Sequence, residues 1–363
     1  MTSLRDTFLE APVESLTIAG LVIGLLFGVL LHRTNFCTMG GVSDIYTLSD
    51  SRRFRAWVLA AATALAGATL LHALGMVDLG TSLYRASRLN WLGHIFGGLV
   101  FGAGMVLAGG CPSRNLVRAG SGDLRAVLTL IVVGIAAFVT LSGVIAPARV
   151  ALADATAIDL TQSGVANQGL DTFAASLFGT EAGSTHRIVG LGLAALIALI
   201  CFTNRDFRNS QIHVLSGLGV GLCVIAAWFV TGLAYDELSV APTAAQSLTF
   251  IRPIGNTTEW LQRSTALGWP GLGPATVFGA LMGAGLSAFL TGRFRVQTFA
   301  DTPDTLRHLG GAMLMGFGGV MAVGCSVGQG ITGVSSLALG SFITFTAIVG
   351  GAVLMLRQLE RRL

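Results

Sequence analysis

Three cysteines stand where apolar stretches of the chain are interrupted by glycine and polar residues: Cys37, Cys111 and Cys325. A neutral thiol is a weak S–H donor, and a file of thiols offers reversible contacts to a soft solute. Pro112 directly follows Cys111, which is typical of a first helical turn and predicts that Cys111 caps a helix. A helix N-terminus presents free N–H groups and favours anions. The expected chemistry is weak, repeated contact with an anion, and a purely structural role for these thiols is the alternative.

Two of the three cysteines close matching stretches of sequence. Residues 94–111 read HIFGGLVFGAGMVLAGGC and residues 308–325 read HLGGAMLMGFGGVMAVGC; at an offset of 214, eight of the eighteen positions are identical. Gly110 and Gly324 precede the cysteines, where the backbone must turn sharply or approach a solute. A duplicated unit that places a thiol twice at the same position indicates a site near the midplane of a transporter or channel.

The other two cysteines, Cys201 and Cys223, lie within apolar stretches and are interpreted as small apolar fillers. The cysteine spacings match no zinc pattern, and no CxxC occurs. The sequence GAGMVLAGG lies in a membrane-like pattern without a preceding strand, so it is no dinucleotide fingerprint. We therefore expect neither a metal nor a cofactor.

The elements that position these cysteines are predicted to be membrane helices. Hydrophobic residues make up 53% of the chain, charged residues make up 11%, and the mean hydropathy is +0.74. A helix needs about 20 apolar residues to cross the hydrocarbon core. The sequence thus predicts an all-α polytopic membrane protein with nine spans, at about 16–32, 54–75, 92–110, 124–146, 186–203, 212–233, 273–291, 308–324 and 340–357.

Short polar or glycine-rich segments beside the cysteines are too short or too polar to span a membrane. Such pieces, at matching places in two halves, are typical of re-entrant or broken helices. Four are expected, at 33–53, 112–123, 326–339 and, by symmetry, 239–250.

The topology follows from the arginines, because the chain contains no lysine. In the nine-span reading, seven arginines fall on the side of the N-terminus and fifteen on the other side. Positive charge marks the cytoplasmic side, so we expect the N-terminus outside, the C-terminus in the cytoplasm and the segment 147–185 as an outer loop. We interpret the net positive charge of the chain as a consequence of this membrane topology. Nothing in the sequence resembles a nucleic-acid-binding module.

The same count of spans predicts an inverted repeat. The whole chain, 1–363, forms one transmembrane domain, in which the first repeat covers about 16–146 and the second about 212–357. A linking span at 186–203 joins them. The second repeat then starts on the opposite face.

Three segments resemble the YeeE/YedE family of sulfur-compound transporters: HRTNFCTMGGVSDIY (32–46), WLGHIFGGLVFGAGMVLAGGCPSRNLVRAG (91–120) and GRFRVQTFADTPDTLRHLGGAMLMGFGGVMAVGCSVGQG (292–330). The resemblance implies a monomer with nine spans, four short helices and two-fold pseudo-symmetry. It also implies that thiosulfate passes from Cys325 to Cys111 to Cys37. The residues expected to support this path are Gly41, Gly110, Pro112, Gly324, Ser326, Gly328, Arg33 and Arg118.

The chain departs from the family pattern near two of the cysteines. It has RTNFC where the family often has Arg-Gly-Arg-Phe-Cys, so a role for an arginine at position 35 is lost, and PSRN follows Cys111 in place of small residues. Local contacts to an anion are therefore expected to differ.

The expected function is import of thiosulfate across the bacterial inner membrane, without enzymatic activity. The resemblance also implies a cytosolic TusA-like sulfur carrier as a partner. Two alternatives stay open: transport of another sulfur or selenium anion, and a membrane sulfur-transfer protein that forms a cysteine persulfide.

Overall fold

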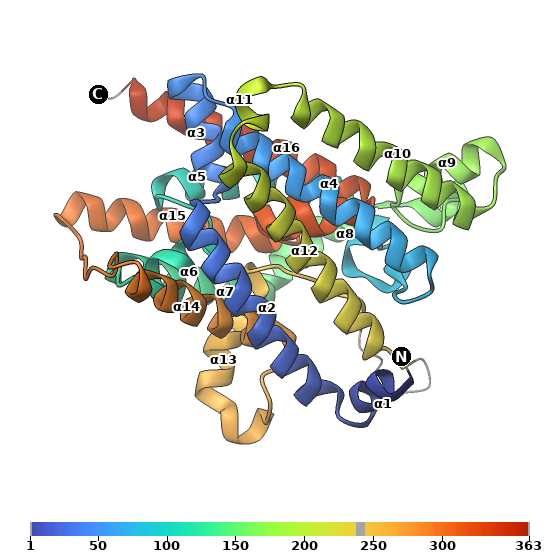
Figure 1. Cartoon of the computed structure of the whole chain (residues 1–363), viewed down its shortest axis with the longest axis horizontal. Coiled ribbons are helices and arrows are strands. Elements are labelled where there is room, and N and C mark those ends of the chain that lie inside the picture. Colours follow the sequence, from blue (N-terminus) through green and yellow to red (C-terminus); the bar gives the residue numbers. More distant parts are fainter. Residues whose placement is uncertain (1, 237–243, 362–363) are drawn as a thin grey trace.

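The computed structural model describes residues 2–236 and 244–361, and most of this part is helical (Figure 1). The predicted all-α polytopic fold is confirmed. The first half of the chain forms α1 (Thr2–Glu10), α2 (Pro12–Thr34), α3 (Thr38–Leu48), α4 (Arg52–Ala73), the π-helix η3 (Gly93–Gly97), α5 (Gly98–Leu107), α6 (Pro112–Gly120), α7 (Leu124–Leu141), α8 (Ala146–Thr156) and α9 (Leu170–Phe178). The second half forms α10 (Ala182–Phe202), α11 (Arg205–Arg208), α12 (Gln211–Leu233), α13 (Ile251–Leu267), α14 (Leu272–Leu290), α15 (Thr302–Met321), the π-helix η5 (Gly328–Gly333) and α16 (Leu339–Glu360).

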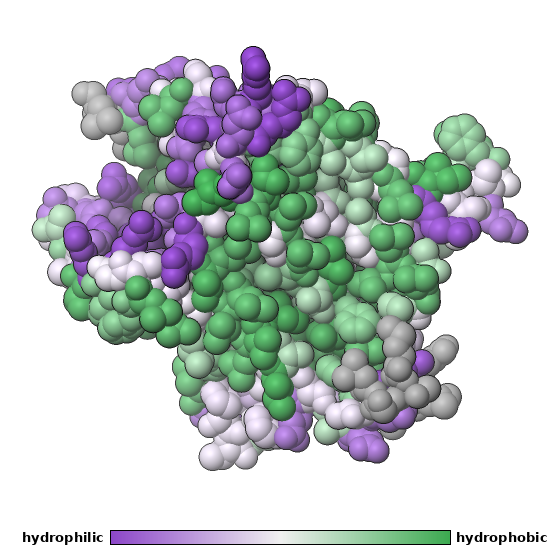
Figure 2. Space-filling model, in the orientation of Figure 1, coloured by the Kyte–Doolittle hydropathy of each residue, from purple (hydrophilic) through white to green (hydrophobic). Residues whose placement is uncertain are grey.

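Eight helices in the described part are long and apolar enough to cross a membrane. Figure 2 shows their apolar side chains as a band between two hydrophilic regions, one near the C-terminus and one near the N-terminus. We call the side where α1 lies the N face and the side where α16 ends the C face. The ninth expected span falls on α15, whose first turns carry Asp304 and Arg307 and are therefore more polar than the others.

The helices pack in pairs that match between the two halves. Helix α2 packs along α14 as α12 packs along α4, and α5 packs along α16 as α15 packs along α7. Further contacts join α2 to α12 and α5 to α15. The matching pairs relate the two halves of the chain, and the inverted orientation of the second repeat stays a prediction.

Glycines set the distance between the continuous pair η3 and α5 and the neighbouring helix α15. A Cβ on Gly104 would lie 2.6 Å from the carbonyl oxygen of Gly311, and a Cβ on Gly97 would lie 2.7 Å from that of Gly318. Side chains at these positions would force the helices apart. The close approach places the ends of α5 and α15 next to the breaks that carry Cys111 and Cys325.

The fourth short segment was predicted at 239–250, and no helix is seen in the part of it that the structure describes. Residues 239–243 lie outside the described part, and residues 244–250 form no helix. The polar groups of this extended stretch bond to α12 instead: Ser247 Oγ donates to the Val224 carbonyl, and Thr231 Oγ1 donates to that of Gln246. The short helix of this half is α13, whose third residue, Pro253, suits a first turn.

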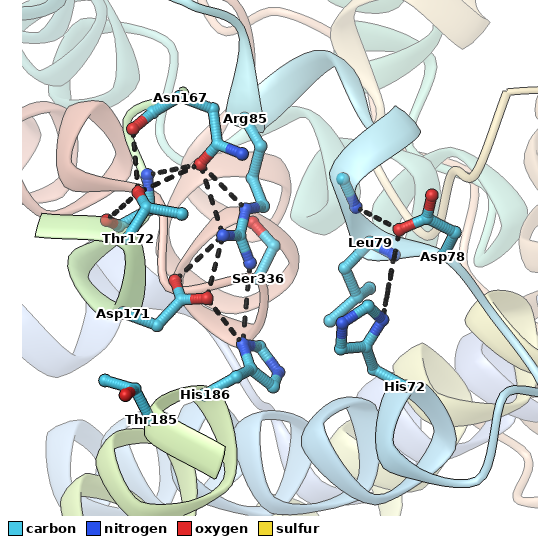
Figure 3. Close-up of polar contacts among 12 residues, drawn as sticks. His72, Asp78, Leu79, Arg85, Asn167, Asp171, Thr172, Thr185, His186 and Ser336 are labelled. Carbon is cyan, nitrogen blue, oxygen red and sulfur yellow. Dashed lines mark hydrogen bonds and ion pairs between the residues drawn. The ribbon is translucent and has the colours of Figure 1, made fainter. Parts of the chain in front are cut away.

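The long connection on the N face is tied down by a buried charged network (Figure 3). Its two-residue strand β2 (Ile158–Asp159) pairs with β1 (Arg88–Leu89). Arg85 Nη2 lies 2.9 and 2.8 Å from the two carboxylate oxygens of Asp171, and both side chains are about 4% exposed. His186 Nδ1 lies 3.0 Å from Asp171 Oδ2. The network joins the loop before α5, the start of α9 and the start of α10.

Candidate functional site

Each of the three cysteines singled out in the sequence stands at the start of a short helix. Cys37 caps α3, and its Sγ accepts from the Gly40 amide at 3.4 Å. Cys325 precedes the turn that leads into η5, and its Sγ accepts from the Gly328 amide at 3.3 Å. Cys111 caps α6, as Pro112 predicted, and its Sγ lies 3.1 Å from Ser113 Oγ. All three thiols therefore occupy helix starts, and those of Cys37 and Cys325 accept from N–H groups there.

The three thiols are brought together from distant parts of the chain. The side chains of Cys37 and Cys111 lie within hydrogen-bonding reach of each other, and Cys111 lies close enough to Cys325 for an electrostatic interaction. Their exposed fractions are 7%, 1% and 1% respectively. The sequence alone could not show that these three side chains, which lie far apart along the chain, converge.

A cavity of about 490 Å³ opens beside Cys325 on the N face. Tyr84 and Thr249 line it, and Thr249 Oγ1 lies 3.9 Å from Cys325 Sγ. Arg252 also lines it. Arg149 lines the cavity too, but its Nε donates to the Thr140 carbonyl at the end of α7, at 3.1 Å.

A second cavity, of about 310 Å³, lies on the C face beyond α6. We call it the C-face basin. Its charged lining is strongly basic, and it consists of Arg114, Arg118, Asp123, Arg125, Arg293 and Arg295. The buried thiols thus lie between two cavities on opposite faces.

The main chain before each of the paired cysteines turns through positive φ. Gly109 and Gly110 have φ of 67° and 154°. At the matching positions Val323 has φ of 60° and is followed by Gly324. A β-branched residue in this region is strained, and such strain persists only where the surroundings impose it. The sharp turns let α5 and α15 end at the middle of the protein and new helices start there.

Two expected path residues contact the thiols or their helices directly. Gly328 supplies the amide to Cys325. Ser326 is fully buried beside Cys325, and its hydroxyl faces the Cys111 thiol. It therefore lies between the two paired cysteines.

Three other expected path residues serve the surrounding frame. A Cβ on Gly41 would meet the backbone of Phe54, so Gly41 permits close packing of α3 on α4. Arg33 Nε donates to Ser287 Oγ at 3.1 Å. Arg118 Nη2 bonds to Asp123 Oδ2 at 2.7 Å, while its Nη1 donates to the Gly109 carbonyl at 3.3 Å. These contacts hold the frame around the thiols.

The carboxylate of Asp123 holds two arginines in the basin. Burial opposes its ionisation, but hydrogen bonds from Arg125 and Arg118 outweigh that effect and lower the pKa of the Asp123 carboxyl. The carboxylate is therefore charged at neutral pH and fixes both guanidinium groups.

The arginine expected to be missing at position 35 has a replacement in space. Arg114 Nη2 donates to Asn35 Oδ1 at 3.2 Å. A guanidinium from α6 thus stands beside Asn35, at the position where the family pattern often has an arginine. Sequence comparison of either motif alone does not reveal this.

Sequence reasoning missed several side chains at the site. Asn115 and Gln329 lie four residues after Cys111 and Cys325, and both are fully buried. Their 214-residue offset and shared carboxamide were a usable signal. Tyr84 and Thr249 lie far from any cysteine in the sequence and carried no such signal. In the described residues no group of three His, Cys, Asp or Glu side chains is placed to hold a metal ion.

Comparison with known proteins agrees with this arrangement. A family model described as sulphur transport matches residues 33–354. The thiosulfate transporter TsuA of Spirochaeta thermophila is 29% identical over 353 residues, covering 94% of this chain and 99% of that protein. TsuA of Escherichia coli is 27% identical over 346 residues, covering 87% of each chain. The probable transporter YedE of Salmonella typhimurium matches 107 residues at 29% identity, which is 29% of this chain. Since the family model covers most of the sequence, this chain belongs to the sulphur transport family.

Proposed function

We propose that this protein imports thiosulfate, or a closely related sulfur anion, across the bacterial inner membrane. The observation that carries the proposal is the file of Cys325, Cys111 and Cys37 between two cavities on opposite faces. The names of the two long relatives, both thiosulfate transporters, support thiosulfate as the cargo.

The proposed path runs from Cys325 through Cys111 to Cys37. A neutral thiol donates a weak S–H hydrogen bond to the terminal sulfur of the anion. Amide groups at the helix starts, such as those of Gly328 and Gly40, stabilise negative charge nearby. Conduction needs sites that are weak enough to release the ion. Thiols meet that condition better than buried arginines, which would trap a dianion.

The proposed orientation places the N face outside and the C face in the cytoplasm. The excess of arginine on the C face supports it. The protein would act as a monomer, and its basic C face suits an acidic surface on a TusA-like sulfur carrier. Both statements rest on the family resemblance.

We infer that the protein transports its substrate without chemically converting it. The alternative, sulfur transfer through a persulfide, requires a covalent adduct on a cysteine. Intact-mass measurement after exposure to thiosulfate distinguishes the two, because a persulfide adds one sulfur atom to the protein.

Uptake of radiolabelled thiosulfate by reconstituted vesicles tests the proposal. Cys111→Ala should abolish uptake, and Cys111→Ser should restore part of it, since a hydroxyl keeps a donor at that position. Cys223→Ala is the matched control, because Cys223 lies outside the file. Normal uptake by Cys111→Ala would refute the thiol path, while failure of the wild type to take up thiosulfate would refute the cargo.

A further inference from the structure

The C-face basin has the composition of an anion-binding site in its own right. Five arginines line it, and Asp123 is the one acidic side chain of its lining in the described part of the chain. Asp123 engages two of the five, Arg118 and Arg125. Arg125 has a second, longer contact of 4.0 Å to Asp304. The remaining three arginines face the basin without an ion pair to its carboxylate.

These three arginines come from two separate elements that converge on one point. Arg114 lies on α6, while Arg293 and Arg295 follow the end of α14. Arg114 and Arg293 both lie close enough to His32, at the end of α2, to interact with it electrostatically. Since like charges repel, three guanidinium groups held around one cavity leave an unbalanced positive potential there.

The segment that carries Arg293 and Arg295 is fixed to the protein. The Arg295 amide donates to the Ser121 carbonyl at 3.1 Å, and the Gln297 amide donates to that of Gly122 at 3.2 Å. In return, the Leu124 amide donates to the Gln297 carbonyl at 2.9 Å. The main chain thus fixes the place of these arginines on the rim of the basin.

The lining also limits what the occupant is. Besides the charged groups, the described residues of the lining are His32, Asn35, Val117, Ser121 and Gln297, of which Val117 alone is aliphatic. A lipid acyl chain finds little apolar surface there. Guanidinium groups bind oxyanions through paired hydrogen bonds.

We propose that the C-face basin is a second anion-binding site, which binds small divalent oxyanions such as sulfate through Arg114, Arg293 and Arg295. It recognises charge and oxygen atoms and needs no thiol, so it accepts sulfate as readily as thiosulfate. Its use as the place where cargo collects after leaving the thiols rests on the proposed function, but the binding itself does not. Fewer arginines are available to an anion in the N-face cavity, because its lining holds two, Arg149 and Arg252, and Arg149 donates to a carbonyl at the end of α7.

Calorimetric titration of the purified full-length protein with sodium sulfate, at constant ionic strength, tests the site. The double substitution Arg293→Gln with Arg295→Gln should weaken sulfate binding about tenfold or more, because charge-assisted hydrogen bonds are lost. Both arginines are exposed, so the fold should survive. Arg208→Gln, an exposed charge on the same face outside the basin, is the matched control.

The thiol variant Cys111→Ser separates this site from the thiol path. Sulfate binding should persist in it even if thiosulfate uptake falls. Unchanged binding in the double variant, or an equal loss in Arg208→Gln, would overturn the proposal. Displacement of sulfate by phosphatidylglycerol but not by thiosulfate would also overturn it, because the occupant would then be a lipid headgroup.

Discussion

Asn115 and Gln329, which match at the 214-residue offset, both donate to main-chain carbonyls beside the paired cysteines. Asn115 Nδ2 donates to the Gly110 carbonyl at 2.9 Å and to the Cys111 carbonyl at 3.2 Å, and Gln329 Nε2 donates to the Ala322 carbonyl. The Gly110 and Ala322 carbonyls follow the C-terminal ends of α5 and α15, where partial negative charge accumulates. The carboxamides neutralise acceptors that would otherwise face an anion in the middle of the membrane.

Asn115→Ala should therefore lower thiosulfate uptake more than its effect on folding explains. An unsatisfied buried carbonyl costs about 1–3 kcal/mol. Two measurements check the expectation: the melting temperature of the detergent-purified protein, and the thiosulfate uptake per folded molecule in reconstituted vesicles. Asn204→Ala is the control, because Asn204 caps α11 at the surface and its loss should reduce stability alone. Equal uptake per folded molecule in both variants would count against the role of Asn115.

Thiol labelling should report the order of the cysteines along the path. A small anionic methanethiosulfonate reagent should reach Cys325 from the N face, where the cavity of Tyr84 and Thr249 opens. It should reach Cys37 or Cys111 from the C face. Thiosulfate should slow both reactions. The experiment uses single-cysteine variants in sealed vesicles of known orientation, and labelling of Cys325 and Cys111 from the same face only would contradict the arrangement.

The close helix contacts predict a sharp difference between two glycines. A Cβ on Gly102 would collide with the Ile348 carbonyl oxygen, whereas a Cβ on Gly310 would meet nothing within 4 Å. Gly102→Ala should lower the free energy of unfolding by roughly 1–3 kcal/mol through overpacking. Gly310→Ala should be neutral, or stabilising by up to about 1 kcal/mol from helix propensity. Thermal melts of the two variants test this, and equal melting temperatures would show that α5 and α16 can move apart freely.

The buried network on the N face predicts a pH-dependent stability. Burial opposes ionisation of Asp171, but His186 and Arg85 outweigh it and lower the pKa of the carboxyl. A lowered folded-state pKa stabilises the fold fully above the unfolded value of about 3.9, and this stabilisation is lost as pH falls toward the folded value. Asp171→Asn should therefore melt below the wild type at pH 7, with the gap closing below about pH 4.

The control for this network is Asp154→Asn. Asp154 pairs with Arg88 at 2.9 Å, but both side chains are more than half exposed. Surface pairs contribute at most about 1 kcal/mol. A pH-independent gap for Asp171→Asn, or a loss as large for Asp154→Asn, would contradict the assignment of this stabilisation to Asp171.

The membrane fold was predictable from the sequence because long apolar stretches have few structural alternatives. The cap at Cys111 was also accessible, since Pro112 marks a helix start. The position of the fourth short helix was not, because residues 244–250 satisfy their polar groups through α12 and need no helix of their own.

Side-chain convergence was beyond the reach of the sequence. Nothing in RTNFC or PSRN places Arg114 beside Asn35, and Tyr84 reaches the N-face cavity from a loop without a motif. These contacts depend on how helices cross, which periodicity does not specify. The matching carboxamides of Asn115 and Gln329 show that the 214-residue offset held more information than its cysteines.

The glycines between α5 and α15 carry one more consequence. Gly104 contacts Gly311, and Gly97 contacts Gly318. At the offset of 214 residues, Gly311 is the counterpart of Gly97, and Gly318 is the counterpart of Gly104. The surface is therefore self-complementary in the way that joins two identical subunits about a two-fold axis. Two separate copies of a half-length ancestor would already have fitted together here, so covalent fusion would have preserved an existing dimer contact.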